Sequence, residues 1–354
     1  MAAGHSASAL ISCNAAGGRS RDRPMLTEEE KRASARRREA NRELGRSRDY
    51  ERVRARPIHP GRRVMVTRRC LERRMFLTPG KSPEETRNFI GYSLGVALQN
   101  TETDLHQSVC LGNHHHSLLT DNKGNLPDFK CSFHGNVARG LNAKHGRFDK
   151  FWSADGSCDT VRPSDDETLE DMVYILVNAV AAGLVKWGDR WPGFTTYGWR
   201  FGETRRYWRP KWYFDPNNAE MPDYVDITLE RPSIFHELSD DELYEKLMKR
   251  VRERELEIQA DMRRRGRRFA GEAKLRKQYW NNQPRTVDPR FTRTPKVAAS
   301  SRWLRLAQLQ RDRAWEREYA VAREEQREGG RPVFPAGTFW MRRHAGVRVA
   351  TGPP

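Results

Sequence analysis

Strand-like and helix-like segments follow one another in a set order between residues 62 and 200, and this order is the feature that most limits the fold. Short β-branched or alternating runs predict strands, and apolar residues at i, i+4 spacing behind a Ser-Pro-Glu type start predict helices. The predicted elements are a strand at 64–67, a helix from Ser82, strands at 105–111 and 114–120, a helix through 129–141 ending near Gly146, a strand-like region around 148–161, and a long helix from Ser164 to about Gly183. The order β-α-β-β-α-β is the split βαβ arrangement of a ferredoxin-like sheet, so the predicted fold class is α+β.

The flanking segments are too polar to form much of a core. The 354-residue chain has a net charge of +18, a pI of about 10.0, a mean hydropathy of −0.90 and 36% hydrophobic residues. We therefore expect a disordered basic arm at 1–56, a compact domain at 57–200 and a basic, mainly helical extension at 201–354. In the extension, the sequence predicts a strand at 226–229, charged helices at 239–283 and 300–328, and a turn followed by a short strand at 334–341.

The excess of positive charge predicts a polyanionic partner, with nucleic acid as the default. The longest apolar stretch, Met172–Val185, contains Asn178 and is shorter than the ~20 residues that span a bilayer, which argues against an integral membrane protein. Five cysteines without a C-x-x-C pair argue against a disulfide framework or a thiolate zinc site. With no secretory signal, this favours a reducing cytosol, and we expect neither a membrane partner nor an organic cofactor.

The strongest local signal for chemistry is the run Asn113-His114-His115-His116. On a strand, alternate side chains share a face, so His114 and His116 point the same way and His115 points to the other face. Two imidazoles on one face suit a divalent metal ion, although a histidine cluster beside a turn is more often structural or exposed.

A second signal lies on the last predicted helix, where Tyr174 and Asn178 are four residues apart and therefore share one side. Taken alone, the pair is most simply a tyrosine at the sheet–helix interface beside a polar neighbour. Combined with the histidine strand, it suggests a tyrosine nucleophile beside a metal held by His114, His116 and the amide oxygen of Asn178. Such a group could cut a phosphodiester and keep the strand as a phosphotyrosine, which allows rejoining.

These residues resemble the HUH single-tyrosine transposases, and in particular the REP-associated tyrosine transposase branch with its IS-two-hundred-like transposase domain. The similar segments span about residues 57–200: the strand Met65–Arg69, the histidine motif Gly112–Leu119, the stretch Gly146–Trp152 and the Y-x-x-x-N helix Tyr174–Val185, with a weaker similarity at Phe334–Thr338. The resemblance implies an HUH endonuclease fold in which the helix delivers Tyr174 to a Mg²⁺ or Mn²⁺ ion held by the sheet. It also implies a substrate of single-stranded DNA beside a hairpin, a bacterial cytoplasmic and nucleoid-associated protein, and either a monomer or a homodimer.

Two residues depart from the family pattern: His115 occupies a position that is normally apolar, and Ala179 stands where this branch usually has proline. Two alternatives remain open, a non-catalytic, domesticated hairpin-binding protein and a zinc hydrolase, the second disfavoured because no further ligand has zincin spacing. A run of charged residues is by default a solvated surface. The sequence nevertheless suggests six arginines as candidates for DNA binding: Arg68, Arg69, Arg263, Arg264, Arg267 and Arg268.

Overall fold

The structure is a computed structural model that describes residues 55–154, 156–163, 167–215, 217–218, 221–284 and 295–352. The chain divides into two compact units. One comprises residues 58–311, and the other comprises residues 312–354 together with 1–57. The predicted N-terminal arm, apart from residues 55 and 56, and the predicted helix start at 164–166 lie outside the described residues. The predicted domain boundaries after residues 56 and 200 stay predictions.

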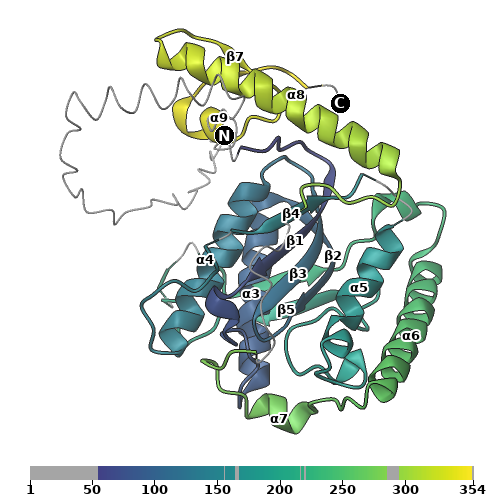
Figure 1. Ribbon diagram of the computed structural model, residues 1–354. Helices are drawn as coiled ribbons and strands as arrows, with labels where there is room; N and C mark the ends of the chain where they lie inside the picture. Colours follow the sequence, from purple (N-terminus) through teal and green to yellow (C-terminus); the bar gives the residue numbers. More distant parts are fainter. Residues whose placement is uncertain are drawn as a thin grey trace, which may run out of the picture. The chain divides into compact units, whose positions relative to one another are not determined.

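A four-stranded antiparallel sheet forms the centre of the 58–311 unit (Figure 1). Its strands are β1 (Arg62–Arg69), β2 (Thr103–Cys110), β3 (His114–Asp121) and β4 (Cys158–Val161). Their spatial order is β2-β3-β1-β4, so β3 lies between the two strands that a helix connects, β1 and β2. The predicted mixed α+β class and the predicted order of strands and helices along the chain are confirmed.

Helices cover both faces of this sheet (Figure 1). Alternate residues of β3 show which helix faces which side, because His115 contacts Phe133 whereas His116 contacts Tyr174. The helices are α3 (Pro83–Thr101) and α4 (Leu126–Lys144) on one face, and α5 (Thr168–Ala181) on the other with α6 (Asp240–Arg264) packed against it. The candidate tyrosine therefore comes from the face opposite α4.

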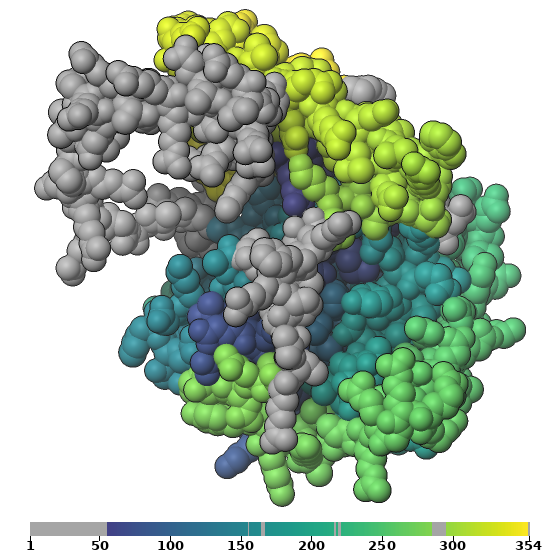
Figure 2. Space-filling view, in the orientation of Figure 1, coloured from purple at the N-terminus to yellow at the C-terminus, as the bar shows by residue number. Residues whose placement is uncertain are grey.

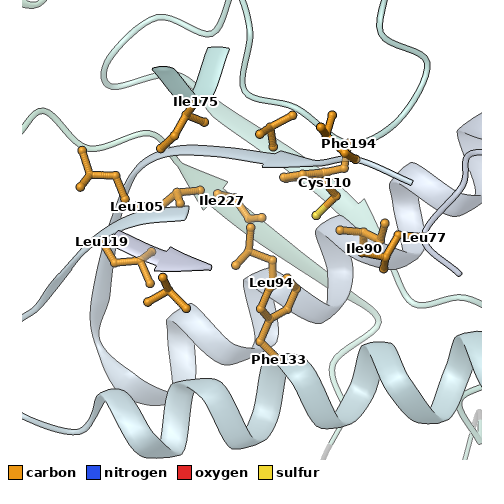
Figure 3. Packing of buried hydrophobic residues seen from close by; sticks show 14 of the residues in the cluster. Leu77, Ile90, Leu94, Leu105, Cys110, Leu119, Phe133, Ile175, Phe194 and Ile227 are labelled. Atoms are coloured by element: carbon orange, nitrogen blue, oxygen red, sulfur yellow. The ribbon is translucent and has the colours of Figure 1, made fainter. Parts of the chain in front are cut away.

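The hydrophobic core fills the space between the sheet and its helices. Leu94 of α3 and Phe133 of α4 point toward each other, and strand residues such as Leu119 complete the layer (Figure 3). The two helices approach closely at Gly140, where a Cβ atom would lie 2.2 Å from a ring carbon of Phe89. A glycine is therefore required at this helix crossing.

A hairpin beyond residue 200 packs on α3 and extends the same core. Its strands are β5 (Thr204–Trp208) and β6 (Tyr224–Thr228), which pair antiparallel. Gly91 and Gly95 lie one helical turn apart on α3, and Cβ atoms there would collide with Tyr207 and Val225 of the hairpin. The strand predicted at 226–229 is thus confirmed, and its partner β5 was not predicted.

Several short helical elements complete the 58–311 unit, and the other unit has a small hydrophobic core of its own. The short elements are η1 (Leu71–Arg73), η2 (Gly188–Arg190), η3 (Ser233–Phe235) and α7 (Glu272–Arg276). The helix α8 (Arg302–Arg327) begins in this unit and continues into the other, which also holds β7 (Val333–Phe334), α9 (Trp340–Ala345) and β8 (Arg348–Val349). Its core is a cluster of Trp315, Tyr319, Ala322 and Phe334.

The predicted start of α3 is confirmed, because Ser82 is its N-cap and Pro83 its first residue, although the Ser82 side chain forms no cap hydrogen bond. Other local predictions are wrong. The strand predicted within 148–161 covers only Cys158–Val161, and the Phe148 side chain is exposed. The helix predicted at 239–283 ends at Arg264, because Gly266 takes a positive φ of 61° and ends the helical run. The segment predicted as a strand after residue 337 contains α9 instead.

Two further findings bear on the expectations from composition. Among the described residues, every helix is too short or too polar to cross a lipid bilayer. Cys70, Cys110 and Cys158 carry free thiols.

Candidate active site

The strand β3 presents His114 and His116 to the same face of the sheet. Its neighbour β1 aligns Arg69 with His114 and Thr67 with His116. The two imidazole rings lie 4.9 Å apart between centroids, in an edge-to-face arrangement. The predicted alternation along this strand therefore places both rings together beside α5.

The helix α5 brings Tyr174 and Asn178 to these rings. Apolar residues along the helix are buried against the sheet and α6, which fixes the rotation of the helix about its axis. The Tyr174 ring lies 5.2 Å from the His116 ring, at an interplanar angle of 79°, and Asn178 hydrogen-bonds to His114. Tyr174 remains 49% exposed, whereas Asn178 is buried. The structure thus brings together all four side chains that the sequence singled out for chemistry.

Hydrogen bonds to neighbouring side chains orient both imidazoles. Nδ1 of His114 donates to Oδ1 of Asn113 over 2.7 Å, because an amide oxygen can only accept. Nδ1 of His116 lies 2.7 Å from Oγ1 of Thr67. Such partners commonly fix the ring orientation of histidines that bind metal ions, and they leave Nε2 of His114 without a proton.

Burial keeps both imidazoles neutral. It lowers the pKa of His114 to about 4, the hydrogen bond between His114 and Asn178 opposes this shift, and the positive charges of Arg69 and Arg73 add to it. Burial, followed by the charge of the neighbouring histidines, holds the pKa of His116 well below its ordinary value. A neutral imidazole is the form that can act as a ligand.

The atoms of this cluster that could bind a metal ion are two imidazole nitrogens and one amide oxygen. Nitrogen and oxygen donors of this kind suit a first-row divalent cation. Among the described residues, no group of three or more His, Cys, Asp or Glu side chains is placed to hold a metal ion. The side chain of Asn178 approaches this histidine pair from α5 and hydrogen-bonds to His114.

His115 belongs to a different, buried network on the α4 face. Its Nε2 lies 2.8 Å from Nε2 of His134, and Arg68 donates through Nη1 to Nδ1 of His134 over 2.9 Å. Arg68 also packs over the Trp152 ring, and Trp152 donates to the carbonyl of His134. The polar residue at the middle of the histidine motif is thus satisfied by a partner on α4, and it does not face Tyr174.

The cationic residues that the sequence offered for DNA binding lie in three different places. Arg68 lies on the α4 face of the sheet, where it bonds to His134 and packs over Trp152. Arg69 lies close enough to His114 to lower its pKa. The other four arginines are exposed at the end of α6 and just beyond it, and we call them the basic turn: Arg263, Arg264, Arg267 and Arg268. Backbone bonds from Ala270 to Gly183 and from Gly271 to Leu184 hold this basic turn beside the end of α5.

Sequence reasoning missed a strained segment next to the histidines. Glu72 and Arg73 both have positive φ, at 51° and 58°, although neither is glycine. The Asn113 amide, which also orients His114, donates to the Arg73 carbonyl over 3.2 Å. Strained backbone of this kind is often held at functional sites, and no residue type in the segment signals it.

Comparisons with known proteins give little beyond this geometry. No protein-family model matches the chain, and no curated protein matches it. One solved structure, described as a REP-associated tyrosine transposase bound to a REP hairpin, is similar with a TM-score of 0.33 and 18% sequence identity. The match covers 40% of this chain and 81% of that one.

Proposed function

We propose that the protein is a transposase-type enzyme that cuts single-stranded DNA beside a hairpin and rejoins it through a covalent phosphotyrosine. The observation that carries the proposal is the convergence of Tyr174 with His114, His116 and Asn178. On this proposal the antiparallel sheet with strand order β2-β3-β1-β4 is a ferredoxin-like split βαβ sheet of the HUH endonuclease type. The chain would then be a member of the REP-associated tyrosine transposase branch.

In the proposed reaction, the Tyr174 oxygen attacks the phosphorus of a phosphodiester. A Tyr174 O–P bond forms, the P–O bond to one deoxyribose breaks, and the proton lost by the phenol balances the one gained by the released hydroxyl. Because about half of the Tyr174 side chain is exposed, a DNA strand can reach its ring. Attack by a DNA hydroxyl on the phosphotyrosine reverses the bond changes and joins the strands.

On this proposal His114, His116 and Asn178 hold a divalent cation, which the resemblance identifies as Mg²⁺ or Mn²⁺. When bound, the cation would withdraw charge from a non-bridging phosphate oxygen. Thr67 and Asn113 hold the two imidazoles in place, and burial keeps them neutral. Arg69, Arg73 and the basic turn after α6 would attract the DNA backbone to this face.

The main alternative is a non-catalytic protein of the same fold that only binds hairpin DNA. Bacterial origin, a cytoplasmic and nucleoid-associated location, and a possible homodimer remain part of the proposal and follow from the resemblance alone.

The test is incubation of the full-length protein with labelled hairpin-bearing single-stranded DNA in Mg²⁺ or Mn²⁺, followed by denaturing electrophoresis. We expect a covalent adduct that is absent in chelator and absent for Tyr174→Phe. The matched control is Tyr224→Phe, an exposed tyrosine on β6 that should leave the adduct intact. Full hairpin affinity in chelator, with no cleavage in either metal, would favour the non-catalytic alternative.

A further inference from the structure

A separate cavity of about 320 Å³ lies in the 58–311 unit and contains none of the four residues of the candidate active site. It is formed by the segment that leads into α3, the end of α4 and the segment that follows α7. In Figure 2, light-green atoms of the segment after α7 lie beside blue-purple atoms from the early part of the chain. A volume of about 300 Å³ is at the lower end of the range for ligand pockets, so the cavity has room for a single small group.

Positive charge dominates the lining of this cavity. The cationic side chains are Lys81, Lys144, Arg276 and Lys277, against one carboxylate, that of Glu85. Lys144 pairs with Glu85 over 3.0 Å, and Arg276 bonds to Glu272 at 2.8 Å. Lys81 and Lys277 are exposed, and within the described part of the chain neither forms an ion pair. Two ammonium groups thus remain available for an anionic ligand.

One wall of the cavity is aromatic and held in place. Trp280 stacks on His145 with ring centroids 4.9 Å apart and an interplanar angle of 17°. His145 is itself fixed, because its Nε2 donates to the Phe76 carbonyl over 2.9 Å. Tyr279 is the neighbouring ring, with centroids 5.0 Å from Trp280, and it is 55% exposed. Flat aromatic rings beside cationic groups are the combination that binds unstacked bases and their phosphates.

The cavity is close to the candidate active site along the chain and in space. The Arg73 carbonyl accepts from Asn113, the residue before His114, and Thr78 lines the cavity. The five Cα–Cα steps from Arg73 to Thr78 span at most about 17 Å. The backbone N–H of Leu77 donates to the Gly112 carbonyl, which ties this segment to the turn just before His114. A strand a few nucleotides long can therefore reach both sites, since single-strand sites commonly cover about 4–16 nucleotides.

We propose that this cavity binds one unstacked nucleotide of the DNA strand on which Tyr174 acts, an inference that rests on the proposed function. The base lies against Tyr279 and the edge of Trp280, and the adjoining phosphate is held by Lys81 and Lys277. The strand is thereby fixed at a set number of nucleotides from Tyr174, which makes the cavity a determinant of where the strand is cut.

The experiment measures binding of fluorescein-labelled single-stranded DNA to the full-length protein in chelator, so that cleavage does not interfere. Tyr279→Ala should weaken binding about tenfold, since stacking on one aromatic ring is worth about that much. Lys277→Gln should lower the slope of log affinity against log salt by about 0.7. Matched controls are Trp303→Ala, another exposed aromatic, and Lys274→Gln, an exposed lysine on α7 outside the cavity lining.

An abasic nucleotide moved along the strand should weaken wild-type binding at one position only, and that position should have no effect for Tyr279→Ala. Equal affinities for Tyr279→Ala and Trp303→Ala, with folding verified by circular dichroism, would overturn the inference. Displacement of the strand by an equal concentration of free deoxynucleoside monophosphate would overturn its assignment to a strand-bound nucleotide. If these binding effects occur but no adduct forms on Tyr174, the nucleotide site stands and the proposed function fails. If Tyr174 forms the adduct but these effects are missing, the proposed function stands and the nucleotide site fails.

Discussion

Acid should destabilise this protein through its buried neutral histidines, and His106 gives the cleanest test because it lies outside the candidate active site. Its Nδ1 donates to the Glu230 carbonyl over 2.8 Å, and its Nε2 lies 2.7 Å from the Thr120 hydroxyl. Burial lowers the pKa of His106 from 6.5 to about 4. Between these two values the unfolded chain binds a proton that the folded chain does not bind, so stability is full above pH 6.5 and is lost as the pH falls toward 4.

The size of this effect follows from the two pKa values. Proton linkage at His106 lowers the free energy of unfolding by about 1.4 kcal/mol at about pH 5.5 and by about 2.5 kcal/mol at about pH 4.5. Other buried histidines add to the loss in the wild-type protein, so the informative quantity is the difference between wild type and a variant. Between neutral pH and each of these pH values, the free energy of unfolding of His106→Gln should therefore fall less than that of the wild type, and the difference should equal the amounts above.

The assay is urea unfolding followed by tryptophan fluorescence at several pH values in chelator. His106→Gln is expected to lose some stability at neutral pH, because the side chain forms two hydrogen bonds. The matched control is His236→Gln, which removes an exposed histidine. Parallel stability curves for wild type and His106→Gln between pH 7 and 4.5 would refute this reasoning.

Two other predictions concern packing and charge. Gly140→Ala should destabilise the protein by about 1–3 kcal/mol because its Cβ collides with Phe89, whereas Gly135→Ala on the same helix meets only the flexible Arg139 side chain and should be neutral or slightly stabilising. Thermal unfolding of the two variants checks this, and equal melting temperatures would contradict it. Neutralising the basic turn after α6 should weaken single-strand binding and flatten its salt dependence by up to about 3 in slope. The variant carries four substitutions: Arg263→Gln, Arg264→Gln, Arg267→Gln and Arg268→Gln. An unchanged salt dependence would show that the turn is only a solvated surface.

The order of elements could be predicted from the sequence because hydrophobic periodicity reports directly on which face of a segment is buried. The alternation across His114, His115 and His116 follows from strand geometry alone, and the shared face of Tyr174 and Asn178 follows from helix geometry. The histidine pair and the Tyr174–Asn178 pair could therefore each be predicted from local sequence. That the two pairs meet is a property of tertiary packing, which the periodicity of either segment does not specify.

Other features depend on contacts between distant residues. His134 is 19 residues from His115 and has no local pattern that marks it as its partner. The left-handed backbone at Glu72 and Arg73 is imposed by surrounding contacts, since neither residue type favours it. The strand β5 is mostly exposed, and its charged sequence lacks the apolar alternation that predicts a strand. The cavity beside Trp280 brings together three segments up to about 200 residues apart.

Locating the covalent bond to DNA tests the central claim most directly. Wild-type protein trapped with labelled hairpin-bearing single-stranded DNA in Mn²⁺ would be digested with trypsin and nuclease and then analysed by mass spectrometry. The tryptic peptide that ends at Lys186 contains one tyrosine, Tyr174, so the assignment is unambiguous. We predict that this peptide carries a nucleotide through the phenol oxygen. A nucleotide linked to a different residue, while the Tyr174 peptide remains unmodified, would contradict the account.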